Sequence, residues 1–464
     1  MRWVLYSTAI FSLLLQEVTP QGQYDVETRY INVPITHFQW QYQQNTFKLR
    51  YLINTRYYVR GGPMFAYLGN SGDINVFAQN SGYLFQLAKH FSALLVFIEH
   101  RYYGKSTPFT NQSLLEENLK FLTTREVLRD FVDVIEMLKS TYLQDVPVTE
   151  TPPIIVFGDS FGGSLAAWMR LKYPHLVLGA IVSSAPVKLS PLVNNCECFY
   201  DVVTKNFEKS GGEQCVKFIK LSWDVVINIT KSKSGMDFLS LKWKLCHRLR
   251  TAEDIAKLLD WLAKIYVRLA LNNYKYPSDF FVNLPSYPIK VFCQKLTTSK
   301  IDDPQALVQH FSRALETYTN YTGTKPCNVL DDLTDYIYNY QQCAELVMPK
   351  CSVDSDMFMN KPWSFANFSQ DCERVYGISN TNNKWILSEY GNVFNYTSNI
   401  VFSQAKLDPY RCYGVNGVTT SAIWAFDIVD GIHRTEFKAP DMVDDNYIIT
   451  ARNNLVKAIY LWLK

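Results

Sequence analysis

Gly158-Asp159-Ser160-Phe161-Gly162 is the stretch that decides the fold. It reads Gly-x-Ser-x-Gly, and it directly follows an apolar run, Ile154-Ile155-Val156-Phe157. Residues 163–171, which come next, are rich in helix-forming side chains. A strand, a sharp turn and a helix in this order form a nucleophile elbow, because glycines permit the tight turn that exposes the serine oxygen above the sheet. We therefore predict that Ser160 is a nucleophile; the alternative is a glycine-rich turn without chemistry.

Further strand patterns lie on both sides of this elbow. Short apolar or alternating runs predict strands at residues 47–53, 64–68, 93–98, 179–184, 399–403 and 423–428. Helical patterns separate several of these strands, including one with a capping box at Thr123 and Glu126 and one at 447–463. Strands that alternate with helices imply a largely parallel sheet with right-handed crossovers, so we predict an α/β fold.

The alternation stops between about residues 189 and 385. Helical patterns occupy 251–272, 304–318 and 330–343 in this segment, which holds nine of the ten cysteines. We predict a helical insertion, stapled by disulfides, that caps the active edge of the sheet. The domain division is then a signal peptide at 1–22, a core in two parts at 23–188 and 386–464, and a cap at 189–385. The pairing of ten cysteines is left open, since sequence does not determine it.

Composition and sorting signals indicate export. Arg2 precedes an apolar run over residues 3–15, in the order of a secretory signal peptide, and no second long apolar stretch predicts a membrane span. The net charge of +3 comes without a basic run, so nucleic acid is not an expected partner. No spacing predicts a metal site, and no cofactor is expected. We expect a secreted or lysosomal glycoprotein, with acceptor sequons at Asn111, Asn228, Asn320, Asn367 and Asn395.

A serine nucleophile needs a base and an acid that orients the base. In α/β-hydrolases these follow the serine in the order Asp or Glu, then His. His433 lies in a loop between a late strand and the last helix, which is where the base belongs. Asp408 follows the strand at 399–403 and is our predicted acid, with Asp427 and Asp430 as rivals. His100, which precedes the elbow, is expected to be structural.

The oxyanion hole of such an enzyme takes backbone N–H groups from two places. One is the residue after the nucleophile, here Phe161. The other is a loop after an early strand, for which Gly69, Asn70 and Ser71 are the candidates. The alternative for this loop is a plain glycine-rich turn.

Longer motifs resemble one known family. Gly158-Asp159-Ser160-Phe161-Gly162-Gly163, Glu99-His100-Arg101-Tyr102-Tyr103-Gly104, Leu407-Asp408-Pro409-Tyr410 and Gly431-Ile432-His433 resemble motifs of the lysosomal prolyl carboxypeptidase, dipeptidyl peptidase II and thymus-specific serine protease family. The resemblance implies an α/β-hydrolase fold with a helical, disulfide-bonded cap and a triad of Ser160, Asp408 and His433. It also implies a serine exopeptidase that cleaves a peptide substrate next to proline, often at acidic pH, and a possible homodimer.

Three departures from the family pattern leave the substrate open. Asp159 stands where relatives usually have Gly, Ser71 where they often have Glu, and Tyr410 where they usually have Trp. An extra carboxylate at 159 would raise the pKa of the base or point beneath the elbow. The alternatives are an esterase-type acyl hydrolase and a catalytically silent secreted binding protein. Aromatic residues that could line the substrate pocket are Trp363, Phe365, Phe368 and Tyr410, although core packing is the alternative for the first three.

Overall fold

Eight strands form one sheet in the computed structural model, which describes residues 24–42, 44–142, 152–297, 304–330, 333–379, 381–391, 394, 396–417, 420 and 422–464. The predicted signal peptide lies outside this range. In sheet order the strands are β1 (Glu27–Pro34), β2 (Thr46–Asn54), β4 (Leu94–Ile98), β3 (Met64–Leu68), β5 (Ile154–Asp159), β6 (Gly179–Ser183), β7 (Ile400–Ala405) and β8 (Ile423–Ile428). The pairs β1–β2 and β2–β4 are antiparallel, and all later pairs are parallel. The elbow follows a central strand, so the predicted α/β-hydrolase fold is confirmed.

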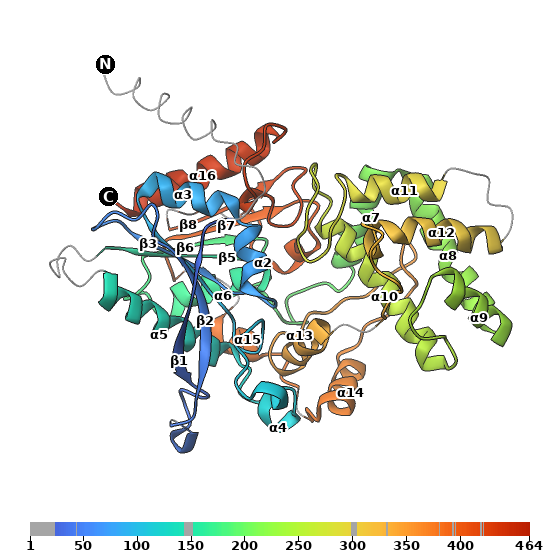
Figure 1. The fold of residues 1–464 in the computed structure, drawn as a ribbon, viewed down its shortest axis with the longest axis horizontal. Helices are drawn as coiled ribbons and strands as arrows, with labels where there is room; N and C mark the ends of the chain where they lie inside the picture. The colour runs from blue at the N-terminus through green and yellow to red at the C-terminus, as the bar shows by residue number, and fades with distance from the viewer. Residues whose placement is uncertain are drawn as a thin grey trace.

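Helices cover both faces of the sheet, and Figure 1 shows α3 and α16 on one side with α5, α6 and α15 on the other. Successive residues of a strand face opposite sides. In β3, Phe65 and Tyr67 therefore join the core beneath α3 and α16, while Met64, Ala66 and Leu68 join the core beneath α5 and α6. The helices are α2 (Ile74–Gln79), α3 (Gly82–Phe91), α4 (Glu116–Leu119), α5 (Thr124–Tyr142), α6 (Ser160–Lys172), α15 (Trp385–Tyr390) and α16 (Asn446–Trp462).

The segment between β6 and β7 is helical, as predicted. Its helices are α7 (Cys198–Gly211), α8 (Glu213–Thr230), α9 (Lys233–Lys242), α10 (Ala252–Leu271), α11 (Pro288–Thr297), α12 (Pro304–Thr319), α13 (Leu333–Ala344) and α14 (Phe365–Tyr376). Figure 1 shows α7 to α12 grouped beside the sheet, with α13 and α14 between this group and α4. The domain limits at 189 and 385 remain a proposal; α15, just beyond the second, already packs on the core, where Tyr390 stacks on Trp168.

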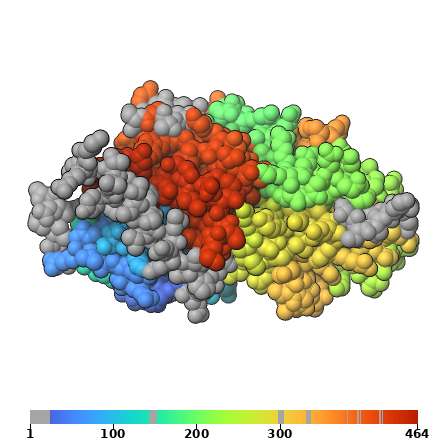
Figure 2. Space-filling view, turned by 90° about the horizontal axis from the view of Figure 1, so that it is seen from above, coloured from blue at the N-terminus to red at the C-terminus, as the bar shows by residue number. Residues whose placement is uncertain are grey.

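Five disulfides staple this segment. The pairs are Cys196–Cys351, Cys198–Cys412, Cys215–Cys293, Cys246–Cys327 and Cys343–Cys372. Only Cys198–Cys412 ties the insertion to the chain after β7. Figure 2 shows the C-terminal residues, in red, directly against the yellow and green insertion, and an ion pair of 2.6 Å joins Lys275 to Asp445 across this boundary. The insertion is thus held to the core covalently and by charge.

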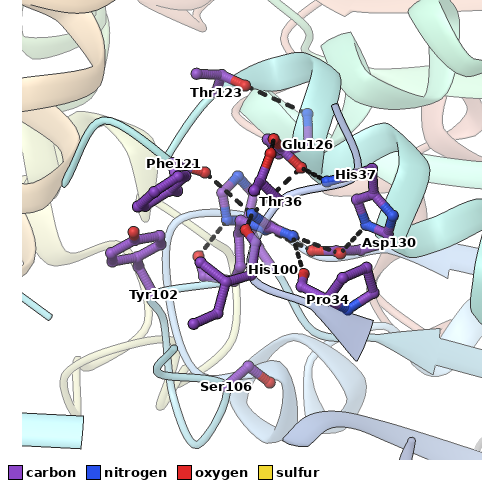
Figure 3. A network of polar contacts seen from close by, with 12 residues as sticks. Pro34, Thr36, His37, His100, Tyr102, Ser106, Phe121, Thr123, Glu126 and Asp130 are labelled. Carbon is purple, nitrogen blue, oxygen red and sulfur yellow. Dashed lines mark hydrogen bonds and ion pairs between the residues drawn. The ribbon is translucent and has the colours of Figure 1, made fainter. Parts of the chain in front are cut away.

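A buried guanidinium anchors the loop after β4 to α5. All five N–H donors of Arg101 are used: the Nε and Nη2 atoms each donate to Asp130 at 2.6 Å, and the rest donate to backbone carbonyls of Pro34, Ile35 and Phe121. Figure 3 shows Asp130 and Glu126 of α5 facing Thr36 and His37 of the loop after β1. The network fixes the position of α5 relative to the loop that follows the edge strand β1.

The predicted capping box at α5 forms only in part. Thr123 Oγ1 accepts from the N–H of Glu126 at 3.3 Å. The Glu126 carboxylate does not return to Thr123; it accepts instead from Thr36 Oγ1 at 2.5 Å and from the His37 N–H at 2.9 Å. A tertiary partner therefore replaces the local one that the sequence pattern indicated.

Candidate active site

The strand-to-helix turn holds Ser160 in a strained conformation. Its φ is +50°, which L residues rarely adopt, and it lies at the first position of α6 directly after β5. The flanking glycines are required by close contacts. A Cβ on Gly158 would lie 2.2 Å from the Gly162 oxygen, and a Cβ on Gly162 would lie 2.6 Å from the Leu68 oxygen. This geometry matches a nucleophile elbow.

An acid and an imidazole meet at the ends of β7 and β8. Asp408 Oδ2 lies 2.8 Å from His433 Nδ1, and the exposed fractions of these residues are 0% and 5%. The second carboxylate oxygen of Asp408 accepts from the Tyr410 N–H at 3.0 Å, which fixes the acid in its turn. The rival acids lie elsewhere: Asp427 contacts Arg411 at 3.4 Å, and the half-exposed Asp430 pairs with Lys209.

One cavity of about 580 Å³ is lined by both Ser160 and His433. The Nδ1 atom of His433 is engaged by Asp408, so its Nε2 atom is the nitrogen left for the cavity. Residues from α7, α10 and α13, together with the loop around Phe280, form much of the remaining wall. The structure thus places Ser160 and the paired His433 at one cavity, with Asp408 directly behind the imidazole.

The oxyanion loop offers fewer N–H groups than the sequence indicated. The Gly69 N–H donates to the Ile98 oxygen at 2.8 Å, and the Ser71 N–H donates to Asn70 Oδ1 at 2.7 Å. The Asn70 N–H has no acceptor among the residues that the structure describes. The Phe161 N–H belongs to the first turn of α6, whose N–H groups lack helical partners. These two N–H groups are therefore the candidate oxyanion donors.

The unusual Asp159 points beneath the elbow, which is the second of the two expected outcomes. Its carboxylate lies 2.7 Å from Arg434 Nε and 2.9 Å from the Tyr67 hydroxyl, which donates to it. Burial, and next the charge of Asp159, raise the pKa of Tyr67 well above its usual value. Asp159 is absent from the residues that line the cavity. The Asp159 side chain therefore does not enter the cavity, which removes one reason to expect a catalytically inactive protein.

Tyr410 lines the cavity, and its ring centroid lies 5.4 Å from that of His433. Trp363, Phe365 and Phe368 do not line the cavity, so the expectation that they form the substrate pocket is corrected. Trp363 and Phe368 instead pack on each other at 6.1 Å, at the start of α14. Besides Tyr410, the described aromatic residues that line the cavity are Phe77, Phe199, Tyr200, Phe280, Phe281, Tyr318 and Tyr338.

Sequence reasoning missed these walls, although one signal was present. Asp260, Lys264, Val267, Arg268 and Leu271 of α10 line the cavity. Their spacing places them on one face of a helix that the sequence did predict. The sequence of this helix does not say what this face contacts, because the facing residues come from other segments, such as Phe199 of α7, Phe280 and Tyr338 of α13.

His100 is structural, as its position suggested. It is fully buried, its Nδ1 lies 2.6 Å from the Arg101 oxygen, and it does not line the cavity. Burial lowers the pKa of its imidazole to about 4. A ring that stays neutral and points into the core does not act as the base.

Among the predicted sequons, Asn111, Asn228 and Asn367 are exposed and Asn320 is half-buried, while Asn395 lies outside the described residues. In the part of the chain that the structure describes, no three His, Cys, Asp or Glu side chains gather as a metal site would require. No helix within the same part has the length and apolar character needed to cross a membrane.

Known proteins resemble this chain along most of its length. Residues 34–455 match the family described as serine carboxypeptidase S28. The lysosomal Pro-X carboxypeptidases of Bos taurus and Homo sapiens are 38% and 37% identical, over 94% of this chain and 87% and 88% of theirs. The thymus-specific serine protease of Homo sapiens is 26% identical over 91% of this chain and 84% of its own. A solved carboxylesterase cloned from a metagenomic library aligns over 99% of this chain and 96% of its own at 12% identity, with a TM-score of 0.35.

Proposed function

Since this chain belongs to the family of S28 serine carboxypeptidases, we propose that it is a serine exopeptidase that hydrolyses peptide bonds next to proline near one end of a peptide. One observation carries the proposal: His433, oriented at 2.8 Å by the buried Asp408, lines the same cavity as the strained Ser160. Family membership makes the chain a serine-type peptidase, and this geometry supports the assignment of the three catalytic roles.

In the proposed reaction, Ser160 attacks the scissile carbonyl while His433 takes its proton. Asp408 holds the imidazole in the required tautomer and stabilises the imidazolium. The negative oxygen of the intermediate accepts from the N–H groups of Phe161 and Asn70. His433 then protonates the leaving amine, and water hydrolyses the acyl-enzyme by the same steps in reverse.

The cavity suits a proline next to the scissile bond. A prolyl amide has no N–H, so an apolar wall leaves no donor unpaired. Aromatic side chains such as Phe199, Tyr338 and Tyr410 provide such a wall near His433. The relatives named Pro-X carboxypeptidases support the same preference.

We propose trimming at the carboxyl end. Cations line the described part of the cavity at Lys264, Arg268 and Lys350, against one carboxylate at Asp260. Lys350 Nζ lies 4.4 Å from the ring centroid of Phe199, and Phe199 in turn contacts Tyr410 beside the base. Positive groups in the cavity attract a terminal carboxylate of the substrate.

We propose a lysosomal or secreted location. Five disulfides fit an oxidising compartment, and the relatives are named as lysosomal. A protein that passes through the secretory pathway to either location would be glycosylated there, and we propose the exposed Asn111, Asn228 and Asn367 as the acceptors. Association of two chains remains a prediction that light scattering of the pure protein tests.

Mass spectrometry of cleaved peptides tests the proposed activity. The substrates are matched peptides with proline or alanine at the penultimate position, each with a free carboxyl end, an amidated end or an acetylated amino end. We expect loss of the last residue from the free-acid proline peptides, with or without acetylation, across acidic pH.

Ser160→Ala should abolish both cleavage and labelling by a fluorophosphonate, whereas Ser140→Ala on the surface of α5 should change neither. Hydrolysis that survives Ser160→Ala would refute the assignment of the nucleophile. Faster cleavage of amidated than of free-acid peptides would refute the carboxyl-end direction, and turnover of acyl esters without any peptide cleavage would favour the esterase alternative.

A further inference from the structure

A buried ion pair lies directly beneath the site. Asp159 precedes the nucleophile and Arg434 follows the base in sequence, and their side chains meet at 2.7 Å between Oδ2 and Nε. Both residues are 0% exposed. Neither lines the cavity that Ser160 and His433 share, so neither contacts substrate.

Arg434 is held from several sides. Its Nη2 donates to Ser81 Oγ at 2.6 Å, its Nη1 donates to the Asn80 oxygen at 3.2 Å, and its backbone N–H donates to Ser184 Oγ at 3.0 Å. Its guanidinium carbon lies 4.5 Å from the ring centroid of Phe280. The residue itself adopts a φ of +49°, which turns the chain sharply after His433. The position of the base therefore depends on a side chain that is fixed in the core.

Asp159 extends the same network to the oxyanion loop. Asn70 Nδ2 donates to the Asp159 backbone oxygen at 2.9 Å and to its Oδ1 at 3.3 Å. The N–H of Asn70 is a candidate oxyanion donor. One carboxylate thus connects the loops that carry the nucleophile, the base and an oxyanion donor.

We propose that Asp159 and Arg434 act as a neutral positioning pair that sets the relative placement of Ser160, His433 and the Asn70 N–H, an inference that rests on the proposed peptidase function. Removing one partner leaves a lone charge in the interior beside the catalytic loops. Catalytic groups must be placed to a fraction of an ångström, and a displacement of 1 Å lowers the rate by about 100-fold. Both effects act on turnover more than on binding, because neither Asp159 nor Arg434 itself lines the cavity.

The charges around the pair fix the expected sign of a pH effect. Arg434 and Asp159 cancel each other near His433, whose imidazole is otherwise faced by Asp408 and Tyr410 and whose backbone oxygen accepts from the Tyr274 hydroxyl. Further groups at the pair are Tyr67, Lys438 on the other side of Asn80, and Asp279, which accepts from Asn80 Nδ2 at 3.1 Å. Burial, and then the charge of Arg434, lower the pKa of Lys438 well below its usual value.

Three variants test the effect of each charge alone and of both together: Asp159→Asn, Arg434→Gln and the double variant. We expect kcat to fall about 100-fold in each single variant with KM changed less than about threefold. The acidic limb of the kcat/KM profile should move to lower pH in D159N, because the uncompensated Arg434 disfavours the imidazolium. It should move to higher pH in R434Q, because the uncompensated Asp159 favours it. In the double variant the limb should return to the wild-type pH while kcat stays low.

A matched control distinguishes positioning from stability. Asp130→Asn breaks a different buried arginine–carboxylate pair, that of Arg101, which does not line the cavity. It should lower the melting temperature and leave the acidic limb in place. If D159N and R434Q keep wild-type kcat, or if their limbs stay where the wild-type limb lies, the proposal is wrong.

Poor folding of the single variants does not remove the test. The double variant has no lone buried charge, so it should fold, and wild-type kcat in this variant would overturn the proposal. A wild-type protein that neither cleaves peptides nor labels at Ser160 would mean that the proposed function had failed. If the wild type is active and the variants keep its kcat and its pH profile, only the positioning role is refuted.

Discussion

Glu345→Gln should abolish an unusual gain of stability at acidic pH. Glu345 follows α13 of the insertion, and its Oε2 accepts from the N–H of Thr124, the first residue of α5, at 2.7 Å. The carboxyl is buried, and burial raises its pKa from 4.5 to about 7. This contact joins the insertion to the core, so its protonation bears on how firmly the two are held together.

The sign and size follow from proton binding. The folded protein holds this proton more tightly than the unfolded chain, so the stabilisation is full below pH 4.5 and is lost as the pH rises through 7. With these two pKa values, the free energy of unfolding should rise by roughly 2 kcal/mol from pH 7.5 to pH 5. Glutamine is neutral at every pH and keeps an acceptor for Thr124. The stability of the variant relative to the wild type should therefore increase by about 2 kcal/mol from pH 5 to pH 7.5.

Urea unfolding at pH 5, 6 and 7.5, followed by tryptophan fluorescence, measures the difference between the two proteins at each pH. The exposed Glu117→Gln on α4 serves as a control that should leave the pH dependence unchanged. The reasoning is refuted if the wild type and E345Q lose stability in parallel between pH 5 and 7.5.

Two further variants probe the framework around the site. Arg101→Lys should cost about 3 kcal/mol of unfolding free energy, since three donors cannot replace five charge-assisted hydrogen bonds in a buried site; an unchanged urea midpoint would contradict this. Replacing Cys198 and Cys412 by serine should lower kcat as well as stability, because this disulfide fixes the turn that follows the acid. The Cys246–Cys327 disulfide also closes a long loop, but neither of its cysteines lines the cavity. Replacing both of these cysteines by serine should lower stability and leave kcat unchanged. Equal kcat in the two disulfide variants would contradict the link to the acid.

Local sequence was sufficient for most of the framework. The strand β3 begins and ends where the apolar run at 64–68 predicted, because a buried parallel strand needs an uninterrupted apolar run. The edge strand β8 also has the predicted bounds, 423–428, although it is only partly buried. Helix α10 likewise lies at 252–271 after its cap at Thr251. The strand β1 was missed, since most of its residues are exposed or half-buried and its apolar signal is weak.

For the site, the order of motifs along the chain sufficed to name the serine, the acid and the imidazole. These residues sit at strand ends, and parallel strands bring their carboxyl ends to one edge. What only the tertiary structure decided is everything that depends on distant partners. It replaced Trp363, Phe365 and Phe368 by other cavity walls, and it paired the ten cysteines. It also turned Asp159 toward Arg434, 275 residues away. A motif records local backbone geometry, whereas a pocket wall or a buried charge pair exists only once separate segments pack together.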